Sequence, residues 1–238
     1  MVAHLLVPTS GTTVVALLWL KAMETLRDRG VLSANACRKW IHVGTGPLFI
    51  LCWLAFPQDA QARYWAAVVP GLITLRFALL GLGVLKDEKT VRSLSRTGDR
   101  TELLKGPLIY GIIFVVCTCV YWRDSSVGIS ILLILCAGDG FADLAGRKYG
   151  GAARLPHNRS KSWAGSCAFF VASLAFQCAY AHLFHAQGWL RVGLAQSLPT
   201  IVAVTLVSTV VESLPVSDWD NLTVSLAAWG CHKLLGSV

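Results

Sequence analysis

Long apolar stretches without a lysine, arginine, aspartate or glutamate dominate the chain. They cover residues 1–20, 40–58, 106–122, 162–190, 192–211 and 221–232. The stretch between Arg63 and Lys86 joins them if Arg76 is accepted inside it, and 125–138 joins them if its helix continues past Asp139. Continuous runs lack the alternation of a β-barrel strand. The pattern predicts an all-α, polytopic transmembrane helical bundle of about seven helices (six to eight), with residues 1–238 as one integral-membrane domain.

Composition agrees with a membrane protein, and the distribution of charge indicates its topology. Only 14% of residues are charged, whereas soluble domains carry about 25%. Sixteen of the 21 lysine and arginine residues lie in the first, third and fifth connections, while the second, fourth and sixth carry only Arg63, Arg123 and Arg191. The basic connections are expected on the cytoplasm-equivalent face. Because the net charge of +8 follows topology, no nucleic-acid partner is expected.

The segment CAGDGFADLAGRKYG, residues 136–150, is unusual for the end of a membrane helix. Asp139, Asp143 and Arg147 are spaced at i, i+4 and i+8, which places them on one face of a helix. Carboxylates at the membrane edge are expected to have a partner or a task, and carboxylate oxygens suit Mg²⁺ bound to a nucleotide phosphate. The alternative is a structural Asp–Arg pair that holds two helices together.

The residues that follow favour the ligand-binding interpretation. The loop supplies fixed positive charges and hydrogen-bond donors, namely Arg147, Lys148, Arg154, Asn158, Arg159, Lys161 and Ser162. Cations beside carboxylates are the groups that bind a metal–triphosphate complex. A loop that was only part of a positive membrane face would not need the neighbouring acids.

The last connection differs from the others expected on the basic face. It carries Glu212, Asp218 and Asp220 and no basic residue. Glu212 ends a helix that is otherwise free of charge, where a carboxylate is unexpected. An acidic connection on this face would pair with the basic loops or help to hold a cation, although Asp218 could equally be a solvated loop residue.

Five segments together resemble the polyprenol kinase family. They are RKWIHVGTG (38–46), SRTGDRTELLKGPLIYG (95–111), GDGFADLAGRKYG (138–150), LPHNRSKSWAGS (155–166) and VESLPVSDWDNLTV (211–224). The second segment is similar to the phytol and farnesol kinase branch of plants and algae. The family also includes dolichol kinase and CTP-dependent diacylglycerol kinase. His157 departs from the aromatic residue expected after Leu-Pro.

The resemblance implies a reaction and a location. The family transfers the terminal phosphoryl group of a nucleoside triphosphate, typically CTP, to a membrane-soluble isoprenoid alcohol. We therefore expect Mg²⁺ as cofactor and a prenyl monophosphate and CDP as products. Phytol is the first candidate acceptor, and farnesol and geranylgeraniol are the others. The branch feeds phytol salvage and tocopherol synthesis, so the chloroplast membrane is the expected location, with the endoplasmic reticulum as the alternative.

The expected site combines these segments. Asp139 and Asp143 would hold Mg²⁺ or accept the alcohol proton, and Lys161 would assist catalysis at the triphosphate. The expected nucleotide-binding residues are Arg147, Lys148, Arg154, Asn158, Ser162 and Lys105. Glu212 and Asp220 would complete the metal site, and Arg38, Lys39, His42 and Asn221 are further candidates. Arg96, Asp99 and Glu102 would either cap the nucleotide together with Lys105 or form a solvated face of the third connection.

Two other functions remain open from the sequence. A lipid-phosphate cytidylyltransferase would use a similar metal–CTP site but release pyrophosphate. A transporter would use intramembrane acids as a proton relay, but its acids should lie near the midplane of several helices. Arg76 stands apart, since it could snorkel, pair with a carboxylate or meet the substrate.

Overall fold

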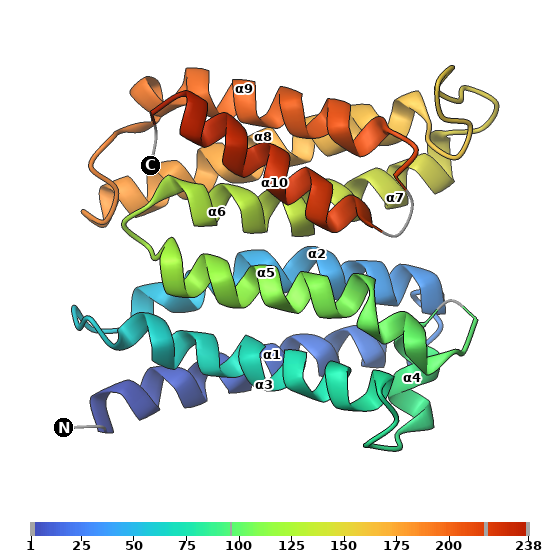
Figure 1. The fold of residues 1–238 in the computed structure, drawn as a ribbon, viewed down its shortest axis with the longest axis horizontal. Helices are drawn as coiled ribbons and strands as arrows, with labels where there is room; N and C mark the ends of the chain where they lie inside the picture. Colours follow the sequence, from blue (N-terminus) through green and yellow to red (C-terminus); the bar gives the residue numbers. More distant parts are fainter. Residues whose placement is uncertain (1–2, 96, 217–218, 237–238) are drawn as a thin grey trace.

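The computed structural model describes residues 3–95, 97–216 and 219–236 as a helical bundle (Figure 1). The elements in chain order are α1 (Ala3–Asp28), α2 (Ala34–Cys52), the 3-10 turn η1 (Trp53–Ala55), α3 (Ala62–Gly81), α4 (Glu88–Leu94), the 3-10 turn η2 (Arg100–Leu104), α5 (Gly106–Val120), α6 (Ser126–Leu133), the π-helical turn η3 (Ile134–Gly138), α7 (Asp139–Tyr149), α8 (Trp163–Ala186), α9 (Leu194–Ser213) and α10 (Asp220–Leu234). Within the described residues the extended pairing is limited to a bridge between Arg154 and Ser162. The predicted all-α fold class is confirmed.

Among the described residues, six stretches are long and apolar enough to cross a membrane. They are α1, α3, Arg100–Val120, Ser126–Tyr149, α8 and α9. α2 and α10 lie alongside them (Figure 1) but do not meet the same criteria. α2 carries Arg38, Lys39 and His42 near its start, and α10 has only 15 residues.

The long helices run antiparallel, so their connections alternate between two ends of the bundle (Figure 1). The end on the right of Figure 1 carries the first, third and fifth connections, the end of α9 and the start of α10, and we call it the basic end. The opposite, far end carries the second, fourth and sixth connections. The grouping of basic residues in the sequence therefore corresponds to one end of the molecule.

Serines begin several of the helices. The side chains of Ser33, Ser125 and Ser162 accept hydrogen bonds from the first turns of α2, α6 and α8. Such N-caps satisfy backbone donors that have no partner inside the helix. Because the cap fixes the first residue of each helix, Ser162 also fixes where the basic loop before α8 ends.

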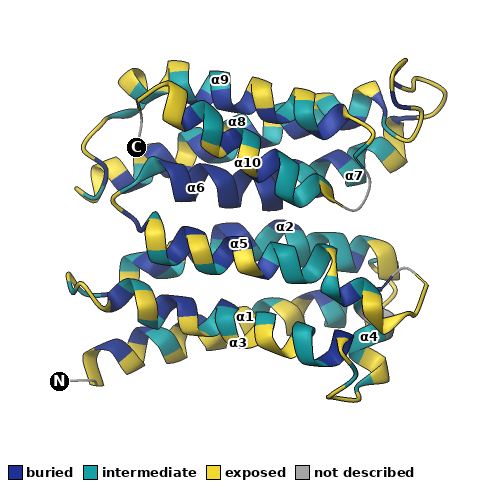
Figure 2. Cartoon of the chain, viewed as in Figure 1, coloured by how far each residue is buried: buried dark blue, intermediate teal, exposed yellow. Residues whose placement is uncertain are grey.

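The central span is continuous from Ser126 to Tyr149 and differs from the others in its burial. Its most apolar window is 78% buried, against 17–39% for the other five spans. Every residue from 127 to 138 is buried, as the dark band in α6 shows (Figure 2). A helix that is apolar on all sides is stable only when other helices surround it. The carboxylates at its end are therefore set in the middle of the bundle.

Glycines allow neighbouring helices to pack closely against this span. A Cβ at Gly138 would meet the Ser173 hydroxyl of α8, and a Cβ at Gly140 would meet Val43 of α2. The chain also widens to a π-helical turn over Ile134–Gly138, directly before Asp139. Such turns are frequent at functional sites, and this one sets the direction in which Asp139 leaves the core.

At the far end, Arg123 ties three connections together. It is 2% exposed, and its guanidinium group donates to the carbonyls of Trp53 at 2.8 Å and Pro57 at 2.7 Å. It also lies 3.5 Å from the centroid of the Trp189 ring, a cation–π contact. Burial lowers the pKa of Arg123 to about 10, which still leaves it charged at neutral pH. The far end is thus closed by a structural cation.

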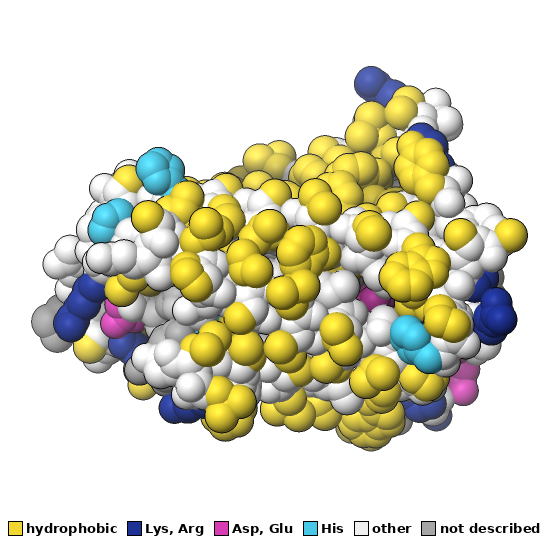
Figure 3. Space-filling model, turned by 90° about the horizontal axis from the view of Figure 1, so that it is seen from above, with side chains coloured by type: hydrophobic (Ala, Val, Ile, Leu, Met, Phe, Trp, Pro, Cys, Tyr) yellow, Lys and Arg dark blue, Asp and Glu magenta, His cyan; other side chains and the backbone are white. Residues whose placement is uncertain are grey.

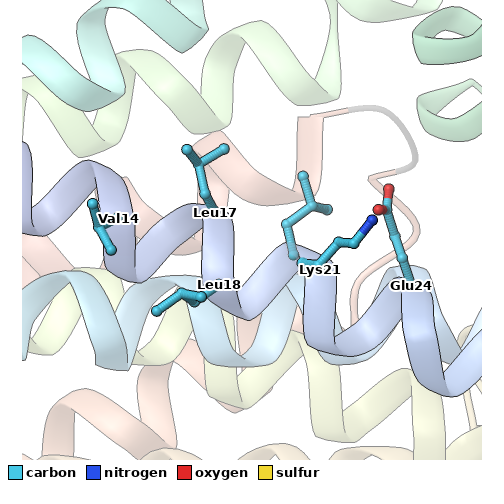
Figure 4. A pocket seen from close by; sticks show the side chains of 6 residues that line it. Val14, Leu17, Leu18, Lys21 and Glu24 are labelled. Atoms are coloured by element: carbon cyan, nitrogen blue, oxygen red, sulfur yellow. The ribbon is translucent and has the colours of Figure 1, made fainter.

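The outer surface of the bundle is apolar. Figure 3 shows hydrophobic side chains across the middle of one face, with lysine and arginine side chains toward both ends of the molecule. Along α1, Val14, Leu17 and Leu18 line a shallow groove that ends at Lys21 and Glu24 (Figure 4). This distribution is the one expected for a bundle surrounded by lipid tails, with its charges at the headgroups.

Candidate active site

The two aspartates of the central span lie at the basic end on one face of α7. Each is 24% exposed. Arg147 Nε donates to Asp143 Oδ2 at 2.8 Å, so the predicted stripe of Asp139, Asp143 and Arg147 is present. Arg147 is 60% exposed, and a pair of this kind contributes little to stability. The Arg147–Asp143 pair does not by itself explain why two carboxylates lie at the end of the buried central span.

Helix α2 places two further groups against the same acids. Lys39 Nζ lies 3.2 Å from Asp139 Oδ2 and 3.9 Å from Asp143 Oδ2. His42 Nε2 donates to the Leu135 carbonyl at 3.0 Å and lies 3.3 Å from Asp139 Oδ2. The ring of His42 stacks on that of Tyr110, with centroids 4.8 Å apart. The structure therefore brings Lys39 and His42 into the candidate site.

A second ion pair lies across from this cluster. Lys161 Nζ pairs with Oε1 of Glu212, which is 4% exposed. Burial acts to lower the pKa of Lys161, but the negative charges of Glu212, Asp139 and Asp220 outweigh it, and the pKa is raised. Lys161 is thus held in the field of three carboxylates and stays charged.

Asp139 and Glu212 line one pocket. The other lining residues are Ile134, Leu135, Phe169, Asp220, Asn221 and Val224, so apolar and polar side chains share the lining. Its volume is about 10 Å³, roughly the room of one water molecule. Glu212 Oε2 is buried and has no hydrogen-bond partner among the described residues. The pocket joins the central span to the acidic connection that the sequence singled out.

Asn158 and Ser162 have structural partners in the loop before α8. Asn158 Nδ2 donates to the Ser213 carbonyl at 3.1 Å, and its Oδ1 accepts from the Ser160 backbone N–H at 3.1 Å. Ser162 Oγ caps α8 by accepting from Gly165 N at 3.2 Å. Both residues hold the loop against the ends of α8 and α9, which positions Lys161. Their expected nucleotide contacts stay a prediction.

The remaining basic candidates lie on the outside of the basic end. Lys148 is exposed and stacks on the ring of Tyr149 at 5.1 Å, and Arg154 Nε donates to the Gly151 carbonyl at 3.1 Å. Neither lines the pocket. Arg38 is half-buried near the start of α2. None of these three cations forms an ion pair with Asp139, Asp143 or Glu212 among the described residues.

The third connection approaches the pocket at one point. Lys105 directly precedes α5, and a Cβ at the next residue, Gly106, would lie 4.0 Å from the Asn221 amide nitrogen. Glu102 accepts from the Thr97 backbone N–H at 3.1 Å, and Asp99 caps η2. These two acids thus order the connection internally. Arg96 and Asp218 lie outside the described residues.

Arg76 belongs to a different part of the molecule. Its guanidinium group donates to Asp87 Oδ2 at 2.6 Å and to Thr90 Oγ1 at 3.3 Å. Of the three interpretations open from the sequence, the structure selects pairing with a carboxylate. The hydrogen bonds from the hydroxyl and backbone N–H of Thr90, and then the Arg76 charge, lower the pKa of Asp87. The contact fastens α4 to α3.

No set of three or more histidine, cysteine, aspartate or glutamate side chains in the described part of the chain is arranged as a metal centre. Asp139 and Asp143 share Lys39, whereas Glu212 pairs with Lys161. Mg²⁺ is commonly bound by one or two carboxylates together with substrate phosphates rather than by a complete protein cage. The unpaired oxygen of Glu212 beside Asp139 is compatible with that mode.

The sequence did not reveal the contact of Lys39 with the aspartates, nor the packing of Tyr110 against His42. Tyr110 stacks on His42, and its hydroxyl lies 3.0 Å from Cys136 Sγ. Lys39 and Asp139 are 100 residues apart, so helical periodicity could not connect them. The available signal was the position of RKWIHVG at the start of a helix on the basic face.

Comparison of the sequence with known proteins identifies the family of the chain. The chain is 40% identical over 238 residues to a probable phytol kinase 2, chloroplastic, of Oryza sativa subsp. japonica, covering 99% of this chain and 76% of that protein. It is 40% identical over 220 residues to the farnesol kinase, chloroplastic, of Arabidopsis thaliana, covering 91% and 71%. It is 38% identical over 208 residues to phytol kinase 1, chloroplastic, of the same plant, covering 87% and 68%.

No protein-family model matches the chain, and no solved structure matches it. The curated relatives cover the central span, the loop before α8 and the acidic connection in one alignment of nearly full length. With about 40% identity over that length, the chain belongs to the phytol and farnesol kinase family.

Proposed function

We propose that the chain phosphorylates a long-chain isoprenoid alcohol of the phytol and farnesol class at a membrane. The observation that carries the proposal is the pocket between Asp139 and Glu212. It lies where the buried central span meets the basic end, between the apolar bundle and the charged connections, and its room for about one water molecule would have to widen to admit the substrates. The names of the relatives, phytol kinase and farnesol kinase, support this acceptor class.

The expected donor is a nucleoside triphosphate, with CTP as the first candidate. Phosphoryl transfer depends on positioning and on neutralising the charge of the phosphate oxygens. Lys161 is held beside the acids and would reach the transferred group, while Arg147 pairs with Asp143 and Lys148 lies exposed near the end of α7. Lys161 would assist the reaction, and Arg147 and Lys148 would bind the rest of the triphosphate.

Mg²⁺ fits the oxygen ligands of the pocket. Asp139 and Asp143 would hold it from the central span, and Glu212 and Asp220 would face it from α9 and α10. When bound, Mg²⁺ would neutralise charge on the phosphate oxygens. The unpaired Oε2 of Glu212 supports the assignment, because a buried carboxylate oxygen without a partner is unfavourable unless a ligand satisfies it.

The acceptor hydroxyl must lose a proton as its oxygen bonds to phosphorus and the nucleoside diphosphate leaves. One carboxylate of the Asp139–Asp143 pair would accept that proton, a contribution of roughly 10²–10⁴-fold in typical enzymes. Lys39 and His42 orient Asp139 through contacts of 3.2 and 3.3 Å. The orientation of this acid is thus fixed before the substrate arrives.

The start of a prenyl chain would enter this pocket, which has room for about one water molecule, by displacing its apolar lining. Ile134, Leu135, Phe169 and Val224 form that lining, and Phe169 is fully buried. The hydroxyl would point to the acids while the tail extends toward the lipid-facing surface. An acceptor that is dissolved in the bilayer explains why the site is built at the end of a buried membrane span.

The chloroplast membrane is the location we propose, since the relatives are chloroplastic. A role in phytol salvage and tocopherol synthesis would follow from phytol as acceptor. The test is an assay of membranes that contain this chain, with a panel of prenols and each labelled nucleoside triphosphate. Formation of a prenyl phosphate by these membranes, but not by membranes with Asp139→Asn, would support the proposal, and equal formation by both would overturn it.

A further inference from the structure

Lys39 provides one ammonium group to two carboxylates of the central span. Its Nζ lies 3.2 Å from Asp139 Oδ2 and 3.9 Å from Asp143 Oδ2, and its side chain is 20% exposed. The lysine comes from α2 and the acids from α7, so the pairing depends on how these helices pack. An ammonium group in this position occupies the oxygens that a divalent cation would need.

Glu212 also pairs with a lysine, but only one of its two carboxylate oxygens takes part. Lys161 pairs with Oε1 of Glu212, while the buried Oε2 has no partner among the described residues. Glu212 and Asp139 face the same narrow pocket. An unpaired, 96% buried carboxylate oxygen in that pocket points to a cationic ligand. A cation that binds Asp139 Oδ2 or Glu212 Oε1 would have to displace the ammonium group there, whereas Oε2 of Glu212 is open to it.

We propose that Lys39 is a built-in counterion that competes with the divalent cation for Asp139 and Asp143. Its single positive charge offsets part of the charge of the two aspartates in the nucleotide-free protein, where Arg147 is the nearer partner of Asp143. When a cation arrives with a triphosphate, the ammonium group leaves the carboxylates and pairs with phosphate oxygens. A lysine suits this task because it is a compact charge on a flexible stem, whereas arginine favours a fixed bidentate geometry.

The identity of the arriving nucleotide rests on the proposed function, but the competition between Lys39 and a divalent cation does not. The two parts can be tested separately, since cation binding is measurable without substrate. The competition predicts opposite effects of removing Lys39. Without Lys39 the aspartates, which keep Arg147 and His42 as neighbours, should bind a divalent cation more tightly, and the nucleotide should bind less tightly.

The test uses the purified full chain in detergent with Mn²⁺ as the probe, followed by the electron paramagnetic resonance signal of free Mn²⁺ without nucleotide. We expect Lys39→Met to bind Mn²⁺ about tenfold more tightly than the wild type, because a neighbouring opposite charge alters carboxylate affinity by at least that factor. Lys21→Met is the matched control. Lys21 lies on α1 toward the basic end, beside the outer groove of Figure 4, and should leave Mn²⁺ binding unchanged.

With Mn²⁺ and CTP both present, Lys39→Met should bind the nucleotide at least tenfold more weakly. Unchanged or weaker Mn²⁺ binding by Lys39→Met would overturn the competition, as would the absence of Mn²⁺ binding in both proteins. Lys39→Gln, which keeps most of the side-chain length, answers the same question if Lys39→Met does not fold. If Lys39→Met binds Mn²⁺ more tightly than the wild type but the wild type phosphorylates no prenol, the proposed function is refuted and the competition still stands.

Discussion

Lys161 and Glu212 form an ion pair that joins the loop before α8 to the end of α9. Glu212 is 4% exposed and Lys161 27%. The pair closes one side of the pocket, and Asp139 lies on the other side. This arrangement links three segments that are far apart in sequence and places acids and cations at the end of a buried membrane span.

Breaking this pair should destabilise the protein. Lys161→Met leaves a buried carboxylate without its cation, which costs about 3–5 kcal/mol in comparable sites, and the partial exposure of Lys161 favours the lower value. Thermal unfolding in detergent measures the effect. The double variant Lys161→Met/Glu212→Gln should recover much of the lost stability, because it removes both charges. Equal losses in the single and double variants would contradict the pairing.

Lys161 should also matter for the nucleotide. Since its pKa is raised by the surrounding carboxylates, Lys161 is protonated across the neutral pH range and can bind phosphate there. We expect Lys161→Ala to raise the apparent KM for CTP about tenfold or more. Steady-state kinetics on folded protein give the result. An unchanged CTP dependence would remove Lys161 from the nucleotide site.

The aspartates of the central span should be essential for phosphorylation and dispensable for insertion. Asp139→Asn and Asp143→Asn are expected to lower kcat by roughly 10²-fold or more, since they remove cation binding or proton acceptance. Asp124→Asn, an exposed acid at the far end, is the matched control and should keep full activity. Normal phosphorylation by both aspartate variants would refute the site assignment.

Arg123 should contribute to stability and not to chemistry. Arg123→Ala removes three hydrogen bonds to the carbonyls of Trp53, Phe56 and Pro57 and the stacking on Trp189. Leaving buried carbonyls unpaired costs about 1–3 kcal/mol each, partly relieved by water. We expect a lower unfolding temperature with little change in KM. Arg191→Ala, an exposed arginine at the same end, should have no measurable effect.

Arg76 should be dispensable for catalysis, although it lies in an apolar span. Its partner Asp87 is half-buried, at 33% exposed, and Arg76 itself is 54% exposed, so the pair is largely screened by solvent. Arg76→Gln should retain activity within about twofold of the wild type. A loss of kcat with intact folding would place Arg76 in the substrate site instead.

Much of the fold and part of the site could be predicted from the sequence. Continuous apolar runs define the spans, and the grouping of lysine and arginine gives the two ends, because both patterns are local. The stripe of Asp139, Asp143 and Arg147 follows from helical spacing and is present. The central span was predicted on the condition that its helix continues past Asp139, and the structure shows that it continues to Tyr149.

Contacts between different helices could not be predicted from these local patterns. The pairing of Lys39 with both aspartates depends on glycines that let α2 approach the central span, and no periodicity encodes it. The partner of Arg76 was open for the same reason. The burial of Arg123 was unexpected, since a basic residue in a short connection is usually solvated.

Product analysis with the purified chain tests the central claim most directly. The measurement uses phytol, Mg²⁺ and CTP labelled separately in the base and in the terminal phosphate. The account predicts that the terminal label appears in phytyl phosphate and the base label in CDP, and that Asp139→Asn and Glu212→Gln abolish both products. Release of pyrophosphate with a cytidine-linked lipid, or equal phytyl phosphate formation by the two variants, would contradict it.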